Sequence, residues 1–334
     1  MSIKSSLIIP AWNAENTIYD CLLSAIKANK PPDEIIVVDD NSNDKTRIIV
    51  DNIIKNYPQV KIFSLKKNIG PAAARDYGVN KSNGNLIFFT DSDTTILANT
   101  FLNSLNTLIK YNADAISGIY HPEPINKGNT QLYKALFFYF QFSKYNKPFS
   151  YETFNGQIAL ITKDVYLKVG GYNLEITWGM DNENEELGRR IIKKHKLLLD
   201  PTFQVKHNFP GFNKLTKTYF YRVSSWMLVF MEDMKFESGG PAALDSGLAA
   251  LSVPIFLLFL TIGLIFNSIF IILCFIFLII WLNGYIKFFR YVLTNKPKFL
   301  VQSILLNLWF SSIISFGAIW GLLRWVIGHR VIKS

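Results

Sequence analysis

The feature that most constrains this chain is an uncharged apolar run of 39 residues, Leu248 to Ile286. One membrane-spanning helix needs roughly 20 apolar residues, so the run is long enough for two. Gly263, Asn267 and Ser268 lie near its middle and predict a tight turn between two helices. A further apolar run, Leu300 to Leu323, predicts a third helix. The C-terminal part of the chain is therefore expected to lie in a membrane.

The basic residues suggest how the chain is oriented. The loop expected between the second and third helices, 287–298, carries four bases and should lie in the cytoplasm with the N-terminal part. A complete third span would place Arg324, Arg330 and Lys333 on the opposite side, against the same rule. A re-entrant or interfacial helix is therefore the alternative for this run. The excess positive charge flanks the apolar runs, which fits anionic lipid rather than nucleic acid as a partner.

The N-terminal part alternates short apolar runs with segments of helical spacing. The expected strands are Ser6–Pro10, Glu34–Asp39, Val60–Leu65 and Asn85–Thr90, and the expected helices are Asn16–Ala28, Asp44–Tyr57 and Gly70–Lys81. This alternation indicates an α/β fold with a mainly parallel sheet. We divide the chain into an α/β domain (1–215), an amphipathic interfacial segment (216–244) and a transmembrane region of two to three helices (245–334).

Acidic residues follow the ends of two expected strands. Asp39 and Asp40 close one, and Asp91 and Asp93 follow another. Ligands of open α/β sheets bind at the carboxyl ends of the strands. Two carboxylates at i and i+2 suit Mg²⁺ or Mn²⁺, although a solvated turn would also use these residues.

Four motifs occur in a fixed order: 7–15 (LIIPAWNAE), 34–46 (EIIVVDDNSNDKT), 68–78 (NIGPAAARDYG) and 91–93 (DSD). Together they resemble the family 2 glycosyltransferases over about residues 5–210. The resemblance implies a GT-A fold, a nucleotide-diphospho-sugar donor with UDP as the default nucleotide, and hexosyl transfer with inversion. The charge argument above adds the expectation that the catalytic domain of this integral membrane protein lies in the cytoplasm.

The same resemblance implies roles for individual residues around the donor. Pro10, Asn13 and Glu15 should surround the nucleotide, Asp39 and Asp40 should face the base, and Arg75 and Asp91 should line the same pocket. Asp93 and Asp91 should hold the metal, and His207 should contact the diphosphate or the metal. For Asp39, Asp40 and Asp44, the alternative role is capping of the helix that follows them. We expect Asp44 to cap that helix and Asp40 to bind ligand.

On the acceptor side, the stretches 170–172 (GGY) and 183–190 (ENEELGRR) also resemble the family. Aligned on Leu187 and Arg190, the position of the family's general base is Asn184. An amide cannot accept a proton from an acceptor hydroxyl. Glu183, Asp181 or Glu185 could replace it. Alternatively, the segment is a charged, solvated helix start with i,i+4 pairs.

The acceptor expected from these features is lipid-linked, either a polyprenyl phosphate or a lipid-bound glycan of envelope polysaccharide or glycolipid synthesis. A polyprenyl phosphate is ionised near neutral pH and needs no base. A non-catalytic nucleotide-sugar-binding scaffold in a membrane assembly is the other interpretation of Asn184. Two aromatic stretches, Leu132–Tyr151 and Tyr219–Phe236, are expected to be core helices or helices in the membrane interface.

Overall fold

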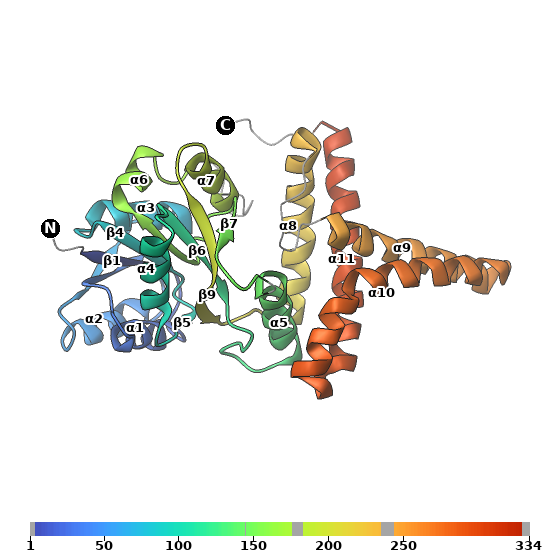
Figure 1. The fold of residues 1–334 in the computed structure, drawn as a ribbon, viewed down its shortest axis with the longest axis horizontal. Coiled ribbons are helices and arrows are strands. Elements are labelled where there is room, and N and C mark those ends of the chain that lie inside the picture. Colours follow the sequence, from blue (N-terminus) through green and yellow to red (C-terminus); the bar gives the residue numbers. More distant parts are fainter. Residues whose placement is uncertain (1–3, 144, 176–182, 235–243, 329–334) are drawn as a thin grey trace. The chain divides into compact units, whose positions relative to one another are not determined.

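The computed structural model describes residues 4–143, 145–175, 183–234 and 244–328. The chain forms two compact units, drawn in Figure 1. An α/β unit contains residues 1–126 and 143–208, and a helical unit contains residues 127–142 and 209–334. The boundary expected at 215 falls inside a helix of the second unit, and residues 235–243 of the expected interfacial segment lie outside the described residues.

The described residues of the α/β unit form a nine-stranded sheet of order β3-β2-β1-β4-β8-β6-β9-β5, with β7 beside β9. The strands are β1 (Ser5–Ala11), β2 (Glu34–Asp39), β3 (Val60–Ser64), β4 (Leu86–Thr90), β5 (Thr94–Ile96), β6 (Ala115–Tyr120), β7 (Phe149–Ser150), β8 (Ile158–Thr162) and β9 (Leu197–His207).

The first four strands in the order are parallel to one another, as the alternating sequence pattern predicts. The second half is mixed, because β8 runs antiparallel to both β4 and β6, whereas β6 and β9 are parallel. The sheet as a whole is therefore a mixed α/β sheet, and its carboxyl-end loops after β1, β2 and β4 meet at one edge.

Helices cover both faces of the sheet, which buries alternate residues of each strand in different cores. Leu7 and Ile9 of β1 belong to one core and Ile8 to the other. The first core receives residues of α1 (Ile18–Lys27), α2 (Thr46–Ile54) and α4 (Thr100–Lys110), and the second those of α3 (Pro71–Lys81), α6 (Lys163–Lys168) and α7 (Glu183–Ile192).

The helical unit holds the apolar runs. Its elements are α5 (Asn129–Ser143), α8 (Phe212–Asp233), α9 (Leu244–Ile265), α10 (Ile269–Asn295), the 3₁₀ turn η1 (Pro297–Phe299) and α11 (Leu300–Val326). Three helices in the described part of the chain are long and apolar enough to cross a membrane, over Gly247–Ile265, Ile269–Asn295 and Pro297–Val326. The expected turn after the first helix is present, with Gly263 packed against Ile271 of α10.

The expectation of a basic loop over 287–298 is wrong, because α10 continues through Lys287 and Arg290 to Asn295. Charged residues do not end a helix, whereas Pro297 lacks an N–H and restricts the residue before it. Lys296 accordingly leaves the helical conformation, with φ −145°. The connection to α11 is reduced to a short turn.

Helix α5, which begins the first aromatic stretch, is part of the core of the helical unit. Tyr133 is buried, stacks on Phe310 of α11 with ring centroids 5.4 Å apart and meets the ring of Phe288 edge-on. Its hydroxyl accepts a hydrogen bond of 3.0 Å from the amide of Asn307. Residues 127–142, which lie between β6 and β7 in the sequence, thus belong to the helical unit.

Candidate functional site

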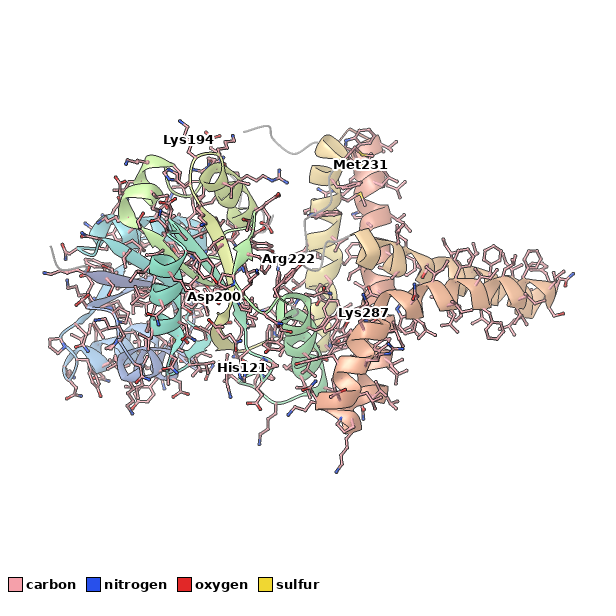
Figure 2. All side chains as sticks on the ribbon, viewed as in Figure 1. His121, Lys194, Asp200, Arg222, Met231 and Lys287 are labelled. Atoms are coloured by element: carbon pink, nitrogen blue, oxygen red, sulfur yellow. The ribbon has the colours of Figure 1, made fainter. Side chains whose placement is uncertain are left out.

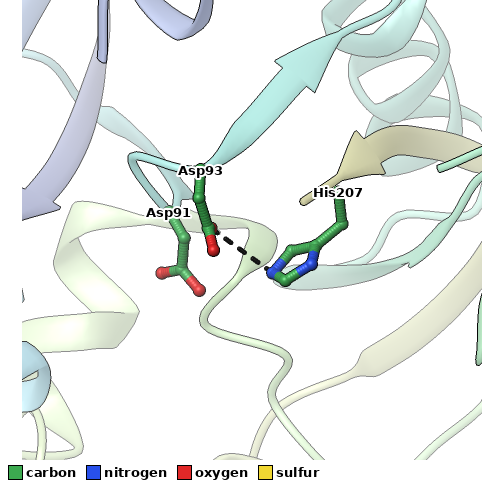
Figure 3. A group of neighbouring side chains, drawn as sticks. All are labelled: Asp91, Asp93 and His207. Atoms are coloured by element: carbon green, nitrogen blue, oxygen red, sulfur yellow. Dashed lines mark ion pairs between the residues drawn. The ribbon is translucent and has the colours of Figure 1, made fainter. Parts of the chain in front are cut away.

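Asp91, Asp93 and His207 come together at the edge where β4 ends (Figure 3). β5 follows Asp93 directly and pairs antiparallel with β9, so that Thr94 lies opposite His207. This register brings Nε2 of His207 to 3.3 Å from Oδ1 of Asp93. One ligand atom from each of the three side chains lies within 4.8 Å of the other two.

The donor set of this cluster fits a divalent cation. Carboxylate oxygens and an imidazole nitrogen are ligands that Mn²⁺ accepts, and carboxylates also suit Mg²⁺. The turn that carries Asp91 and Asp93 is stabilised by the Thr94 hydroxyl, which donates a hydrogen bond of 2.8 Å to the carbonyl of Asp91. Burial raises the pKa of the nearby Cys21 thiol to about 12, which keeps it protonated and unsuited to metal binding.

Arg75 of α3 forms a buried ion pair with Asp91. Its Nη2 lies 2.6 Å from Oδ1 of Asp91, and the arginine is only 3% exposed. Burial by itself lowers the pKa of Arg75, but the charge of Asp91 outweighs it and raises this pKa above its ordinary value. Among the described residues, Nε and Nη1 of Arg75 have no hydrogen-bond partner. The ion pair therefore orients the carboxylate of Asp91. The Nε and Nη1 groups of Arg75 remain as hydrogen-bond donors within the site.

The loops after β1 and β2 are joined by hydrogen bonds between side chains and backbone. Asn13, at φ 50°, accepts a bond from the N–H of Asn43, and Glu15 accepts one from the N–H of Lys45. Pro10 is buried at the end of β1. These residues lie at the carboxyl edge of the sheet, where the resemblance places the nucleotide.

The acidic residues after β2 have distinct contacts. Asp44 accepts from the N–H of Thr46, the first residue of α2, although the N-cap position of this helix is Lys45 and not the expected Asp44. Asp40 accepts from the N–H groups of Ile69 and Gly70, at 2.8 Å each, and so fixes the loop before α3. Asp39 accepts from the N–H of Ser42. A contact of Asp39 or Asp40 with a nucleotide base stays a prediction.

Asn184, in the second position of α7, is buried at 7% exposure. Its amide oxygen accepts hydrogen bonds from the N–H of Gly156 and from the hydroxyl of Tyr172, both at 3.2 Å. A Cβ on Gly156 would lie 2.2 Å from the Tyr172 hydroxyl oxygen and 2.8 Å from this amide oxygen. Asn184 therefore holds two neighbouring segments in place.

Glu183 begins α7 and is half-buried, and its charge acts on both Arg75 and Tyr172. Of the carboxylates considered as bases, Asp181 lies outside the described residues. The expected pair of Glu186 and Arg190 is present at 2.6 Å, but Arg190 also donates to the carbonyl of Gly171. The segment is thus an anchored part of the site rather than only a solvated helix start.

The structure adds Gly156 and the hydroxyl of Tyr172 to the residues of the site. Tyr172 lies under Arg75, whose guanidinium carbon is 5.7 Å from the ring centroid. The GGY motif indicates Tyr172, but the sequence does not show that the hydroxyl of Tyr172 donates to Asn184. Gly156 lies between Asn155 and Gln157 with no other glycine nearby, and this isolated glycine is the only sequence signal for it.

Comparison with known proteins agrees with this geometry. The family model "Glycosyl transferase family 2" matches residues 6–170. This segment is a family 2 glycosyltransferase domain. The matched range contains all four ordered motifs and Arg75, Asp91 and Asp93 of the site.

Two curated relatives illustrate the similarity. An uncharacterized glycosyltransferase of Haemophilus influenzae is 38% identical over 105 residues, which are 31% of this chain and 42% of the relative. The UDP-Glc:alpha-D-GlcNAc-diphosphoundecaprenol beta-1,3-glucosyltransferase WfgD of Escherichia coli is 31% identical over 34% of this chain and 45% of its own length. The match therefore spans less than half of either relative.

The fold extends the likeness beyond the matched segment. The mannosyltransferase PcManGT from Pyrobaculum calidifontis, solved in complex with GDP-Man and Mn²⁺, superposes with a TM-score of 0.58 at 13% identity. The superposition covers 97% of this chain and 87% of that protein. The chain thus has a GT-A-like domain followed by apolar helices.

Proposed function

We propose that this protein transfers a sugar from a nucleotide-diphospho-sugar, with UDP as the default nucleotide, to a lipid-linked acceptor. The observation that carries the proposal is the cluster of Asp91, Asp93 and His207 at the carboxyl edge of the sheet. The printed name of the Escherichia coli relative describes a UDP-sugar donor and a diphosphoundecaprenol-linked acceptor, which supports both choices. The transfer belongs to envelope polysaccharide or glycolipid synthesis and is hexosyl transfer with inversion.

In this mechanism Asp91, Asp93 and His207 would hold Mg²⁺ or Mn²⁺. When bound, the cation supplies charge neutralisation for the departing diphosphate and Lewis acidity. Arg75 keeps the carboxylate of Asp91 oriented through their ion pair at 2.6 Å. The loops containing Pro10, Asn13, Glu15, Asp39 and Asp40 bind the nucleotide.

For an acceptor hydroxyl, Glu183 takes the proton. Asn184 cannot do so, since its amide oxygen already accepts two hydrogen bonds and an amide is not a base in this range. Asp181 is the other carboxylate considered for this role. A polyprenyl phosphate as nucleophile would need no base, because it is already ionised.

The test uses detergent-purified full-length protein with Mn²⁺, a panel of UDP-, GDP- and dTDP-sugars, and native lipid extract. Nucleoside diphosphate release should depend on the metal and on the lipid. Asp93→Ala should reduce the rate by about a hundredfold or more, because several kcal/mol of charge stabilisation are lost. Asp164→Asn is the matched control, since Asp164 is an exposed carboxylate on α6 paired with Lys168.

Two results would overturn the proposal. Donor binding without release under all acceptor conditions would favour the non-catalytic scaffold. Release that is equal in Asp93→Ala and in the control would remove the cluster from the reaction.

We further propose that the α/β domain lies in the cytoplasm. Bases at the end of α10 and in the following turn support this orientation: Lys287, Arg290, Lys296 and Lys298. Protease added to inverted membrane vesicles should digest the N-terminal domain, whereas digestion only from the opposite side would contradict the orientation.

A further inference from the structure

Lys134 is a lysine buried within the helical unit. It lies on α5, is 8% exposed, and donates a hydrogen bond of 2.8 Å to the hydroxyl of Tyr219 on α8. Its ammonium lies 4.4 Å from the centroid of the Tyr219 ring and 4.2 Å from that of Phe138. The aromatic faces attract the cation but do not neutralise it.

No carboxylate in the described part of the chain forms an ion pair with Lys134. The charge that shifts its pKa is positive, that of Arg222, one helical turn beyond Tyr219 on α8 and labelled in Figure 2. Burial, and after it the charge of Arg222, lowers the pKa of Lys134 well below its ordinary value. The charge of Arg222 thus acts on the aromatic-walled position of Lys134.

The sequence explains why Lys134 has no carboxylate beside it on its own helix. α5 contains no acidic residue, and the acidic residues of the helical unit all lie between 232 and 245. Glu232 is thirteen residues beyond Tyr219, which on one helix corresponds to roughly 20 Å. Charging a buried lysine without an opposite partner is costly, and an anion supplied from outside the chain would offset that cost.

The donors of this site suit a phosphate group. An ammonium has three donors, and Lys134 uses one of them for Tyr219. The Tyr219 oxygen accepts that bond, so its own O–H is available to donate. The guanidinium of Arg222 adds planar donors that match phosphate geometry. The surrounding rings and the apolar helices of the same unit favour a phosphate carried on a lipid chain.

We propose that Lys134, Tyr219 and Arg222 bind the phosphate of the lipid-linked acceptor. The inference rests on the proposed function for the identity of that lipid. It names a binding site in the helical unit, whereas the donor site lies in the α/β unit.

Equilibrium binding of dodecyl phosphate to the detergent-purified full chain tests the site without any sugar donor. Lys134→Met, which keeps the apolar stem, should weaken binding about ten- to a hundredfold, as expected for a lost charged hydrogen bond. Lys217→Gln is the matched control, because Lys217 is an exposed lysine on α8, and it should change binding by less than about twofold. Equal binding by the two variants would overturn the site.

The source of the phosphate is resolved by competition. Inorganic phosphate that competes as well as dodecyl phosphate would indicate a free-phosphate site, and phosphatidylglycerol vesicles that compete equally would indicate bulk headgroups. Either result would overturn the assignment to the acceptor. Dodecanol should not compete, because it lacks the anion.

If Lys134→Met does not fold, Tyr219→Phe removes one donor and keeps the ring, and Arg222→Gln removes the exposed charge. Each should weaken dodecyl phosphate binding, and unchanged binding in both would contradict the proposal. Wild-type protein that releases nucleoside diphosphate but does not bind dodecyl phosphate would contradict this site alone. Wild-type protein that binds dodecyl phosphate but releases no nucleoside diphosphate would contradict the proposed function alone. In an active enzyme, Lys134→Met should raise the KM for the lipid with little change in KM for the donor.

Discussion

The hydroxyl of Tyr172 donates a hydrogen bond of 3.2 Å to the amide oxygen of Asn184. The same oxygen accepts from the N–H of Gly156, so the side chain faces inward, toward the loop before β8. The residue that occupies the position of the family's base is thus used here as a structural acceptor. A carboxylate could make the same two contacts, which gives a direct test.

Asn184→Ala should lower the thermal unfolding midpoint, and Asn184→Asp should not. The alanine leaves a buried hydroxyl and a buried N–H without an acceptor, at a cost of about 1–3 kcal/mol. That corresponds to roughly 2–4 °C per kcal/mol for a unit of this size. Equal midpoints for Asn184→Ala and the wild-type protein, measured by intrinsic fluorescence in detergent, would contradict the structural role.

Asp91→Ala and Asp93→Ala should differ in stability although both remove a carboxylate from the same cluster. The first leaves Arg75 buried and unpaired, which costs about 3–5 kcal/mol. The second removes a side chain that is 39% exposed and should cost about 0–1 kcal/mol. Thermal unfolding of the two variants side by side checks this, and indistinguishable midpoints would argue against the importance of the Arg75 ion pair.

His207→Gln should weaken Mn²⁺ binding by about tenfold or more, since loss of groups around a metal has effects of this size. The measurement is titration of Mn²⁺ followed by electron paramagnetic resonance of the free ion. His195→Gln is the control, because His195 lies near Asp114 and outside the cluster. A matching loss in both variants would show that the histidine effect is not local.

Glu183→Gln should reduce kcat for a hydroxyl acceptor by about 10²- to 10⁴-fold, as removal of a general base does. Donor affinity should remain unchanged, because the residue acts on the acceptor. Full activity in this variant and in Asp181→Asn would exclude both carboxylates and leave an ionised lipid phosphate as the nucleophile.

Acid sensitivity of the α/β domain should depend on Glu34. Burial raises the pKa of this carboxyl, but hydrogen bonds from Lys61, Ser6 and Asn83 outweigh it and lower the pKa to about 2 from the ordinary 4.5. Because the folded value is the lower one, the stabilisation is present above about pH 4.5 and is lost as the pH falls toward 2. The unfolding midpoint of Glu34→Gln should therefore fall less between pH 5 and pH 3 than that of the wild-type protein. An equal fall of the unfolding midpoint with pH in the two proteins would contradict this role of Glu34.

The sequence predicts those parts of the fold that depend on local patterns. The β-branched run Glu34–Asp39 is a strand with the expected bounds, and α3 begins at Pro71, directly after Gly70. The end of the apolar run at Ile286 does not coincide with the end of α10, because the helix continues to Asn295 and Pro297 sets its end.

Features that depend on contacts between distant segments could not be predicted in this way. The identity of Asn184 was informative, but its orientation is fixed by Gly156, 28 residues away in another loop. The partners of α5 were also hidden, because an aromatic stretch indicates burial without naming the surface that buries it. The motifs therefore predict which residue types the site contains, but they do not predict how those side chains are oriented.

The place of α5 in the sequence affects how the molecule can be divided. Cutting after Asn208 would remove α8 to α11 yet keep α5, whose Tyr133 and Phe137 pack against Phe288 in the intact protein. The truncated product would carry an apolar helix with no partner and would be expected to aggregate. A water-soluble catalytic fragment requires a second excision, of residues 127–142, closed by a short flexible linker.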